Sequence, residues 1–196
     1  MRSLRPVLAA MIAATLVSTG ADAQGSTAPQ QTTVILVRHG EKDTSNPLDP
    51  DPALSPAGQQ RARDLYQLLK GRHVDAIITT QLGRTRLTAA PLADSQHITA
   101  EVVPATRDAQ ANAADVAQSI RTRHAGQTVL VVGHSNTVTK IIAALGGPAL
   151  ADICDSAHGN LFTLVLPANG TPRLERAHYG AADPPDDACA DGLRKP

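Results

Sequence analysis

Aromatic residues are scarce in this chain of 196 residues, which has no tryptophan, two tyrosines and one phenylalanine. The core therefore cannot be built around large rings, and alanine, valine, leucine and isoleucine must fill it instead. Such residues suit a β-sheet covered by alanine-rich helices. The length of the chain makes one domain with a sizeable core the expected organisation.

An excess of charge of either sign is also missing, because 18 lysines and arginines balance 18 aspartates and glutamates. A protein that binds nucleic acid through its overall field needs a basic surplus. We therefore expect no nucleic-acid partner, and any anion must be bound by a local group of side chains.

Cysteine is limited to Cys154 and Cys189, and the chain has no Cys-x-x-Cys or His-x-x-His pair. This spacing excludes a zinc site of the usual kind. Neither cysteine has the companion residues of a nucleophile. Two alternatives remain for the pair, namely a disulfide that fixes the end of the chain or two unrelated thiols.

The longest apolar run near the N-terminus, Val7–Val17, has 11 residues. Spanning a bilayer takes about 20 apolar residues, although a membrane anchor remains the competing interpretation. Two arginines precede the run and the small-x-small pattern Ala21–Ala23 follows it, so residues 1–23 are predicted to be a signal peptide. Export to the periplasm or the exterior follows, without stable membrane insertion after cleavage, and residues 24–33 become a flexible leader.

Strands and helices alternate along the rest of the chain, which predicts an α/β fold: a three-layer sandwich with a mostly parallel central sheet. One domain is expected over residues 34–180, with a loosely held, proline- and aspartate-rich tail at 181–196. Strands are predicted at 34–37, 76–79, 99–103, 128–132, 161–166 and 173–178, and helices at 56–70, 84–93, 109–124 and 138–145.

Three predicted junctions carry the side chains of an anion site. Arg38 and His39 directly follow the first strand, His134 follows the strand at 128–132, and Arg84 begins the helix after the second strand. The carboxyl ends of parallel strands meet at one edge of a sheet, where open α/β folds bind ligands. Two arginines and two histidines at that edge suit a tetrahedral phosphate group.

Four stretches resemble the histidine phosphatase superfamily, whose fold is phosphoglycerate mutase-like. They occur in the family's order and span most of the predicted domain. The matching stretches are Leu36–Glu41 (LVRHGE), Leu54–Ala62 (LSPAGQQRA), Thr80–Ala89 (TQLGRTRLTA) and Val132–Asn136 (VGHSN).

The resemblance implies a role for each of the four residues. His39 would attack phosphorus and form a phosphohistidine, and it must be neutral to do so. Arg38, Arg84 and His134 would bind the phosphoryl oxygens and stabilise the charge that develops during transfer. The resemblance implies no metal and no other cofactor.

The proton donor to the leaving group is less well defined. In the mutase-like branch an acidic residue after the second helix has this role, and Asp108 lies at about that place. Glu41 is a second candidate because it is close to His39, although it could instead pair with a nearby arginine or lysine. A third alternative is another residue or no strong acid at all. His158 could reach the site, but we expect it on the surface.

The resemblance implies a phosphatase that hydrolyses phosphomonoesters on a small phosphorylated substrate, and the predicted signal peptide makes it an exported one. A sugar phosphate or a phosphorylated envelope glycan is the substrate suggested by analogy. Two alternatives stay open: a non-catalytic protein that binds phosphate or glycan, and a phosphotransferase of the phosphoglycerate mutase type.

Overall fold

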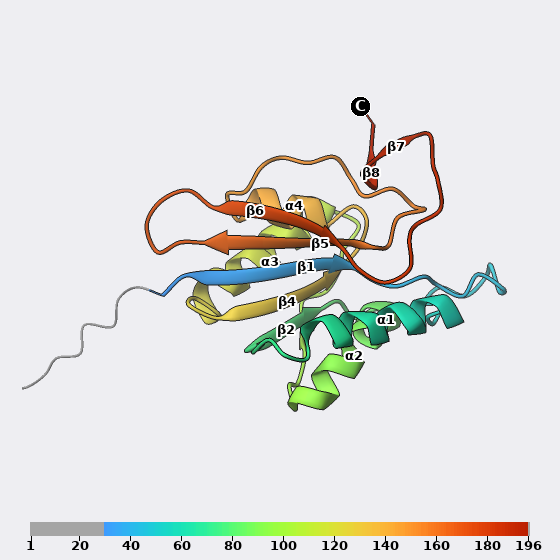
Figure 1. Ribbon diagram of the computed structural model, residues 1–196, viewed down its shortest axis with the longest axis horizontal. Coiled ribbons are helices and arrows are strands. Elements are labelled where there is room, and N and C mark those ends of the chain that lie inside the picture. Colours follow the sequence, from blue (N-terminus) through green and yellow to red (C-terminus); the bar gives the residue numbers. More distant parts are fainter. Residues whose placement is uncertain (1–29, 196) are drawn as a thin grey trace, which may run out of the picture.

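The computed structural model describes residues 30–195, so the predicted signal peptide lies outside the described residues. A six-stranded sheet forms the middle layer in the order β3-β2-β4-β1-β5-β6 (Figure 1). The first four strands in this order run parallel, β5 is antiparallel to β1, and β6 is antiparallel to β5 and so runs in the direction of the first four. The strands are β1 (Thr32–Arg38), β2 (Ala76–Thr79), β3 (Glu101–Val102), β4 (Thr128–Gly133), β5 (Asn160–Leu166) and β6 (Arg173–His178).

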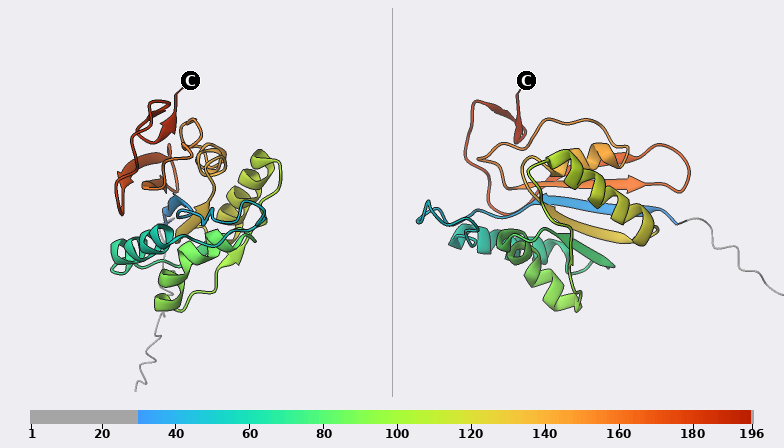
Figure 2. Two further views of the ribbon diagram at one scale, coloured as in Figure 1. Left: turned by 90° about the vertical axis from the view of Figure 1, so that its right-hand side faces the viewer. Right: turned by 180° about the vertical axis from the view of Figure 1, so that it is seen from behind.

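Helices cover both faces of this sheet, as the predicted sandwich requires (Figure 2). They are α1 (Pro56–Leu69), α2 (Gly83–Gln96), α3 (Ala109–Arg123) and α4 (Val138–Ala144). None of the helices within residues 30–195 is both long and apolar enough to cross a membrane.

The central strand β1 shows why both faces are apolar. Val34 and Leu36 pack into the core cluster that includes α3 and α4, whereas Ile35 and Val37 pack into the cluster that includes α1 and α2. All four side chains are fully buried. Alternate side chains of a strand point to opposite faces, so a strand between two helical layers must be apolar throughout.

Helix α2 is longer than predicted. Because proline lacks an amide hydrogen, Pro91 predicts that the helix ends near residue 93. The helix instead includes Pro91 and continues to Gln96, where His97 ends it with a left-handed φ of 56°.

The segment after Tyr179 is not a loosely held tail, and this expectation was wrong. Its end forms a hairpin of β7 (Cys189–Ala190) and β8 (Leu193–Arg194), and Leu193 pairs with Ile153. A disulfide joins Cys154 to Cys189, with Cα atoms 6.3 Å apart, which confirms the first of the two alternatives for the cysteines. A polar composition indicated a loop correctly but did not reveal these attachments.

Candidate active site

The carboxyl ends of β1 and β4 lie side by side (Figure 1) and bring the two predicted histidines together. The ring centroids of His39 and His134 are 5.3 Å apart. Arg84, from the first turn of α2, places its Nε 3.2 Å from Nε2 of His39. Arg38 ends β1 beside them, so all four predicted residues meet at one edge of the sheet.

His39 is fixed as a neutral imidazole with its lone pair on Nε2. Its Nδ1 lies 2.7 Å from the carbonyl of Gly40, and a carbonyl can only accept, so Nδ1 carries the hydrogen. The Arg84 Nε–H donates to Nε2, which agrees with a lone pair there. Burial lowers the pKa of His39 to about 2, although the Gly40 hydrogen bond opposes this shift, and the positive charges of Arg38 and Arg84 reinforce it. The site therefore holds this imidazole in the form that can attack an electrophile.

Arg38 is positioned by main-chain carbonyls rather than by an acidic side chain. Its Nη1 donates to the carbonyls of Cys154, Asp155 and Ala157 at 2.7, 3.0 and 2.9 Å. The buried Nε–H has no hydrogen-bond partner among residues 30–195. An unpaired buried donor is costly, so we expect this N–H to gain an acceptor when an anion binds at the strand edge.

His134 is also kept neutral. Its backbone amide donates to Oγ1 of Thr137, and its Nε2 lies 3.2 Å from Oγ1 of Thr80. Burial, with the positive charges of Arg84 and Arg38, lowers its pKa to about 4. A neutral imidazole offers one N–H, which can donate to a phosphoryl oxygen without a permanent charge on the ring.

Asp51 contacts Arg84 and was missed by the sequence analysis. Its carboxylate accepts from the Gly83 amide at 2.8 and 3.0 Å and lies 3.4 Å from Nη1 of Arg84. It thereby caps the start of α2, where Leu82 has no polar side chain to offer. A loop rich in aspartate gave no signal that would single out this residue.

Glu41 forms an ion pair, the second of the two roles considered for it. Its carboxylate accepts from Nε and Nη2 of Arg61, the shortest distance being 2.7 Å. Burial opposes ionisation of Glu41, but the Arg61 hydrogen bonds outweigh it and lower the pKa of the carboxyl group. Arg61 in turn donates to the carbonyls of Tyr179 and Ala181, which ties this pair to the C-terminal segment.

Asp108 is exposed at the start of α3. Its Oδ1 accepts from the amides of Gln110 and Ala111 at 2.8 and 3.1 Å, so it acts as the N-cap of the helix. The loop before it is linked to the site indirectly, because Gln81 exchanges two hydrogen bonds with Ala105. Its part in proton transfer stays a prediction.

His158 is not a surface residue, contrary to expectation. Its ring is half-buried, and its centroid lies 6.0 Å from that of His39. Its Nδ1 is 3.0 Å from the carbonyl oxygen of His39. The chain returns from α4 across the edge of the sheet, and no local pattern around residue 158 indicated this.

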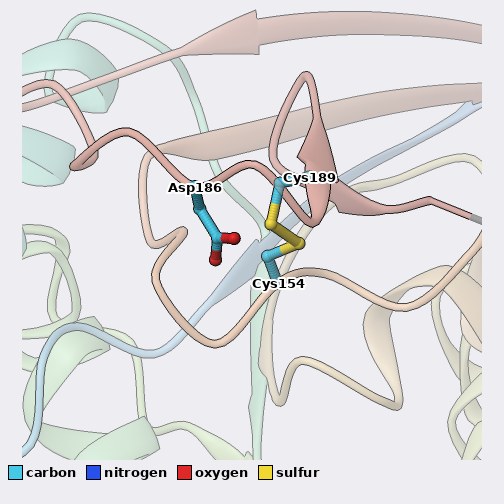
Figure 3. Close-up of side chains that lie close together, drawn as sticks. All are labelled: Cys154, Asp186 and Cys189. Atoms are coloured by element: carbon cyan, nitrogen blue, oxygen red, sulfur yellow. A yellow bond between two sulfur atoms is a disulfide. The ribbon is translucent and has the colours of Figure 1, made fainter.

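Figure 3 shows the group of potential metal ligands found within residues 30–195, namely Cys154, Asp186 and Cys189. Both sulfurs are engaged in the disulfide, and the carboxylate of Asp186 accepts from Oγ of Ser156 at 2.6 Å. This cluster therefore fastens the C-terminal segment to the loop that contacts Arg38.

Comparison with known proteins agrees with this geometry. The family model of the histidine phosphatase superfamily (branch 1) matches residues 34–109, which include His39 and Arg84. Phosphoserine phosphatase 1 of Hydrogenobacter thermophilus is 40% identical over 72 residues. That match covers 33% of this chain and 33% of the relative, so the aligned part spans about a third of the relative's length.

Solved structures share the fold over most of their length. A mycobacterial glucosyl-3-phosphoglycerate phosphatase in complex with VO3 matches with a TM-score of 0.56 and 17% identity, covering 73% of this chain and 96% of that one. The protein histidine phosphatase SixA complexed with tungstate matches with a TM-score of 0.59 and 19% identity, covering 74% and 96%. At these identities the likeness is one of fold.

Proposed function

Because the chain belongs to the histidine phosphatase superfamily, we propose that it hydrolyses phosphomonoesters through a phosphohistidine at His39. The observation that carries this proposal is the state of the His39 ring. Its Nδ1–H is bound to the Gly40 carbonyl and its Nε2 lone pair is directed at the Arg84 guanidinium. A substrate phosphate attracted by Arg84 is thereby brought to the nucleophilic atom.

The reaction takes two displacements. In the first, Nε2 of His39 forms a bond to phosphorus as the bond to the leaving oxygen breaks, and that oxygen takes up a proton. In the second, water attacks phosphorus and releases one proton, which balances the proton taken up in the first step, while the N–P bond breaks and inorganic phosphate leaves as the lone pair returns to Nε2. Arg38, through its unpaired Nε–H, acts with Arg84 and His134 to bind the phosphoryl oxygens in both transition states. These donors supply the charge stabilisation, so the proposal includes no metal.

The substrate is proposed to be a small phosphorylated molecule outside the cytoplasm, such as a sugar phosphate or an envelope glycan phosphate. The names of the relatives support a phosphorylated small molecule, since they include a phosphoserine and a glucosyl-3-phosphoglycerate phosphatase. The disulfide supports an oxidising compartment, where such bonds persist. Export with cleavage of residues 1–23 is part of the same proposal.

The test is turnover of p-nitrophenyl phosphate by purified protein lacking residues 1–23, with His39→Ala as the matched control. We expect the wild type to turn over this substrate and His39→Ala to be slower by at least about a thousandfold. Rapid quenching of the wild type with labelled substrate should also trap an acid-labile, alkali-stable phosphoenzyme that His39→Ala does not form.

Other results would favour the alternatives. A protein that binds inorganic phosphate but turns over no member of a broad phosphomonoester panel would be a binding protein. Transfer of the phosphoryl group to a sugar or glycerate acceptor in preference to water would indicate a phosphotransferase.

A further inference from the structure

The main chain of His39 is fixed on both sides by residues far away in the sequence. Its amide donates to the carbonyl of Gly133 in β4 at 3.0 Å. Its carbonyl lies 3.0 Å from Nδ1 of His158. With the ring Nδ1 bound to Gly40, the polar atom of His39 left for a substrate is Nε2.

The contact with His158 has a defined direction. A carbonyl oxygen can only accept, so Nδ1 of His158 must carry the hydrogen and donate it. The neutral ring then has its lone pair on Nε2. Burial, together with the positive charge of Arg38, lowers the pKa of His158 and favours this neutral form.

His158 is itself held in place from the C-terminal segment. Asp183 accepts from the backbone amide of His158 at 2.8 Å and from that of Gly159 at 3.0 and 3.1 Å. The same turn supplies the Ala157 carbonyl to Arg38. One short loop therefore contacts both the nucleophile and the arginine beside it.

We propose that His158 is a positioning residue for the nucleophile: its Nδ1–H holds the His39 carbonyl so that Nε2 of His39 is aimed at the phosphoryl group. This inference rests on the proposed function for its effect on rate. Its structural part, the fixed orientation of His39, can be measured without any turnover. A misplacement of a reacting group by about 1 Å can cost up to a hundredfold in rate.

A different role for His158 would use Nε2, which could exchange a proton with the leaving group or with water. Two substitutions separate the roles. His158→Asn places an amide N–H at the position of Nδ1, and His158→Gln places one at the position of Nε2. His158→Phe keeps the bulk of the ring and removes both nitrogens.

For positioning, we expect kcat on p-nitrophenyl phosphate to fall about tenfold in His158→Phe and His158→Gln, with KM within about twofold. His158→Asn should recover most of the loss. In parallel, ¹⁵N-histidine spectra of the wild type should show one tautomer for His39, assigned by its loss in His39→Ala. That signal should become mixed or broadened in the Phe and Gln variants and return in His158→Asn.

Equal losses of kcat in the Asn and Gln variants, with the His39 signal unchanged, would overturn the proposal in favour of proton transfer by Nε2. Unchanged kcat and an unchanged His39 signal in all variants would overturn it as well. If His158→Phe does not fold, the contrast between Asn and Gln still decides. If the wild type shows no turnover, the proposed function fails while the spectra still test the positioning of His39.

Discussion

The site has two sides that are built differently. The strand-end side consists of His39, Arg84 and His134, which come from junctions of β1, β2 and β4. The C-terminal side consists of the loop at 152–159 and the segment at 179–194. The first side supplies the side chains that meet a substrate, whereas the second supplies main-chain carbonyls and anchoring contacts to Arg38 and to the ion pair of Glu41.

The difference concerns which part of the chain has to carry a particular residue type. A side chain that binds phosphate must be an arginine or a histidine, so the strand-end side leaves a pattern in the sequence. A carbonyl is present at every residue, so the three acceptors of Arg38 leave none. The C-terminal side is therefore specified by where the chain runs rather than by which residues it contains there.

The two arginines provide the most sensitive test of this difference. Both Arg38→Ala and Arg84→Ala should lower kcat/KM by about a hundred- to a thousandfold, because each removes a donor to the transition state. Only Arg38→Ala also leaves the carbonyls of Cys154 and Ala157 buried without a donor. We expect it alone to lose about 2–3 kcal/mol of unfolding free energy, measured by urea denaturation.

Arg38→Lys is the matched control, since its single ammonium group cannot serve both the carbonyls and the phosphate. It should restore part of the stability and little of the activity. Equal loss of stability in Arg38→Ala and Arg84→Ala would show that the C-terminal side does not depend on the arginine.

The sequence predicted the strand-end side well and the C-terminal side poorly. The buried run before Arg38 and the glycine after His39 indicated a strand end, and the register of β1 with β4 confirmed that His39 and His134 meet. Neither Asp51 nor His158 could be found in this way. Their roles depend on loops that cross the sheet edge, and the course of a loop is set by distant anchors such as Asp183 rather than by local periodicity.

The disulfide tests whether the C-terminal side acts on phosphate binding. Replacing Cys154 and Cys189 by serine opens a link with a sequence separation of 35 residues. A loop of that length predicts a loss of about 3–4 kcal/mol of unfolding free energy. Since the Cys154 carbonyl accepts from Arg38, KM for p-nitrophenyl phosphate should rise several-fold at the same time.

Dithiothreitol should reproduce both effects in the wild type and have neither in the double variant. Loss of stability with an unaltered KM would mean that the disulfide only fastens the tail and that Arg38 is positioned without it.

Acid should lower the unfolding free energy of the protein through the two histidines of the strand-end side. The pKa values of His39 and His134 are about 2 and about 4 in the folded protein, against roughly 6.5 when unfolded. Between these limits the unfolded chain binds protons that the folded chain does not, so the stability present above about pH 6.5 is lost as the pH falls. From pH 7 to pH 5 each histidine should cost about 2 kcal/mol.

His39→Asn should therefore flatten the dependence of the unfolding free energy on pH by about that amount. The control variant is His97→Asn. His97 is exposed, and asparagine tolerates the left-handed backbone conformation at this position. The same dependence on pH in wild type and His39→Asn would contradict the strongly lowered pKa of the nucleophile.

The smallest expected effects concern two aspartates outside both sides, Asp108 and Asp51. Asparagine is as good a helix cap as aspartate, so Asp108→Asn preserves the start of α3 and removes only the acid. If Asp108 protonates the leaving group, kcat should fall about tenfold for an alkyl phosphate and hardly at all for p-nitrophenyl phosphate, whose leaving group needs no proton.

Asp51→Asn should instead tighten binding of inorganic phosphate a few-fold, because it frees Arg84 from a competing carboxylate. A leaving-group-dependent loss in Asp51→Asn, with none in Asp108→Asn, would move the proton donor to the loop that contacts Arg84 and make that loop part of the strand-end side.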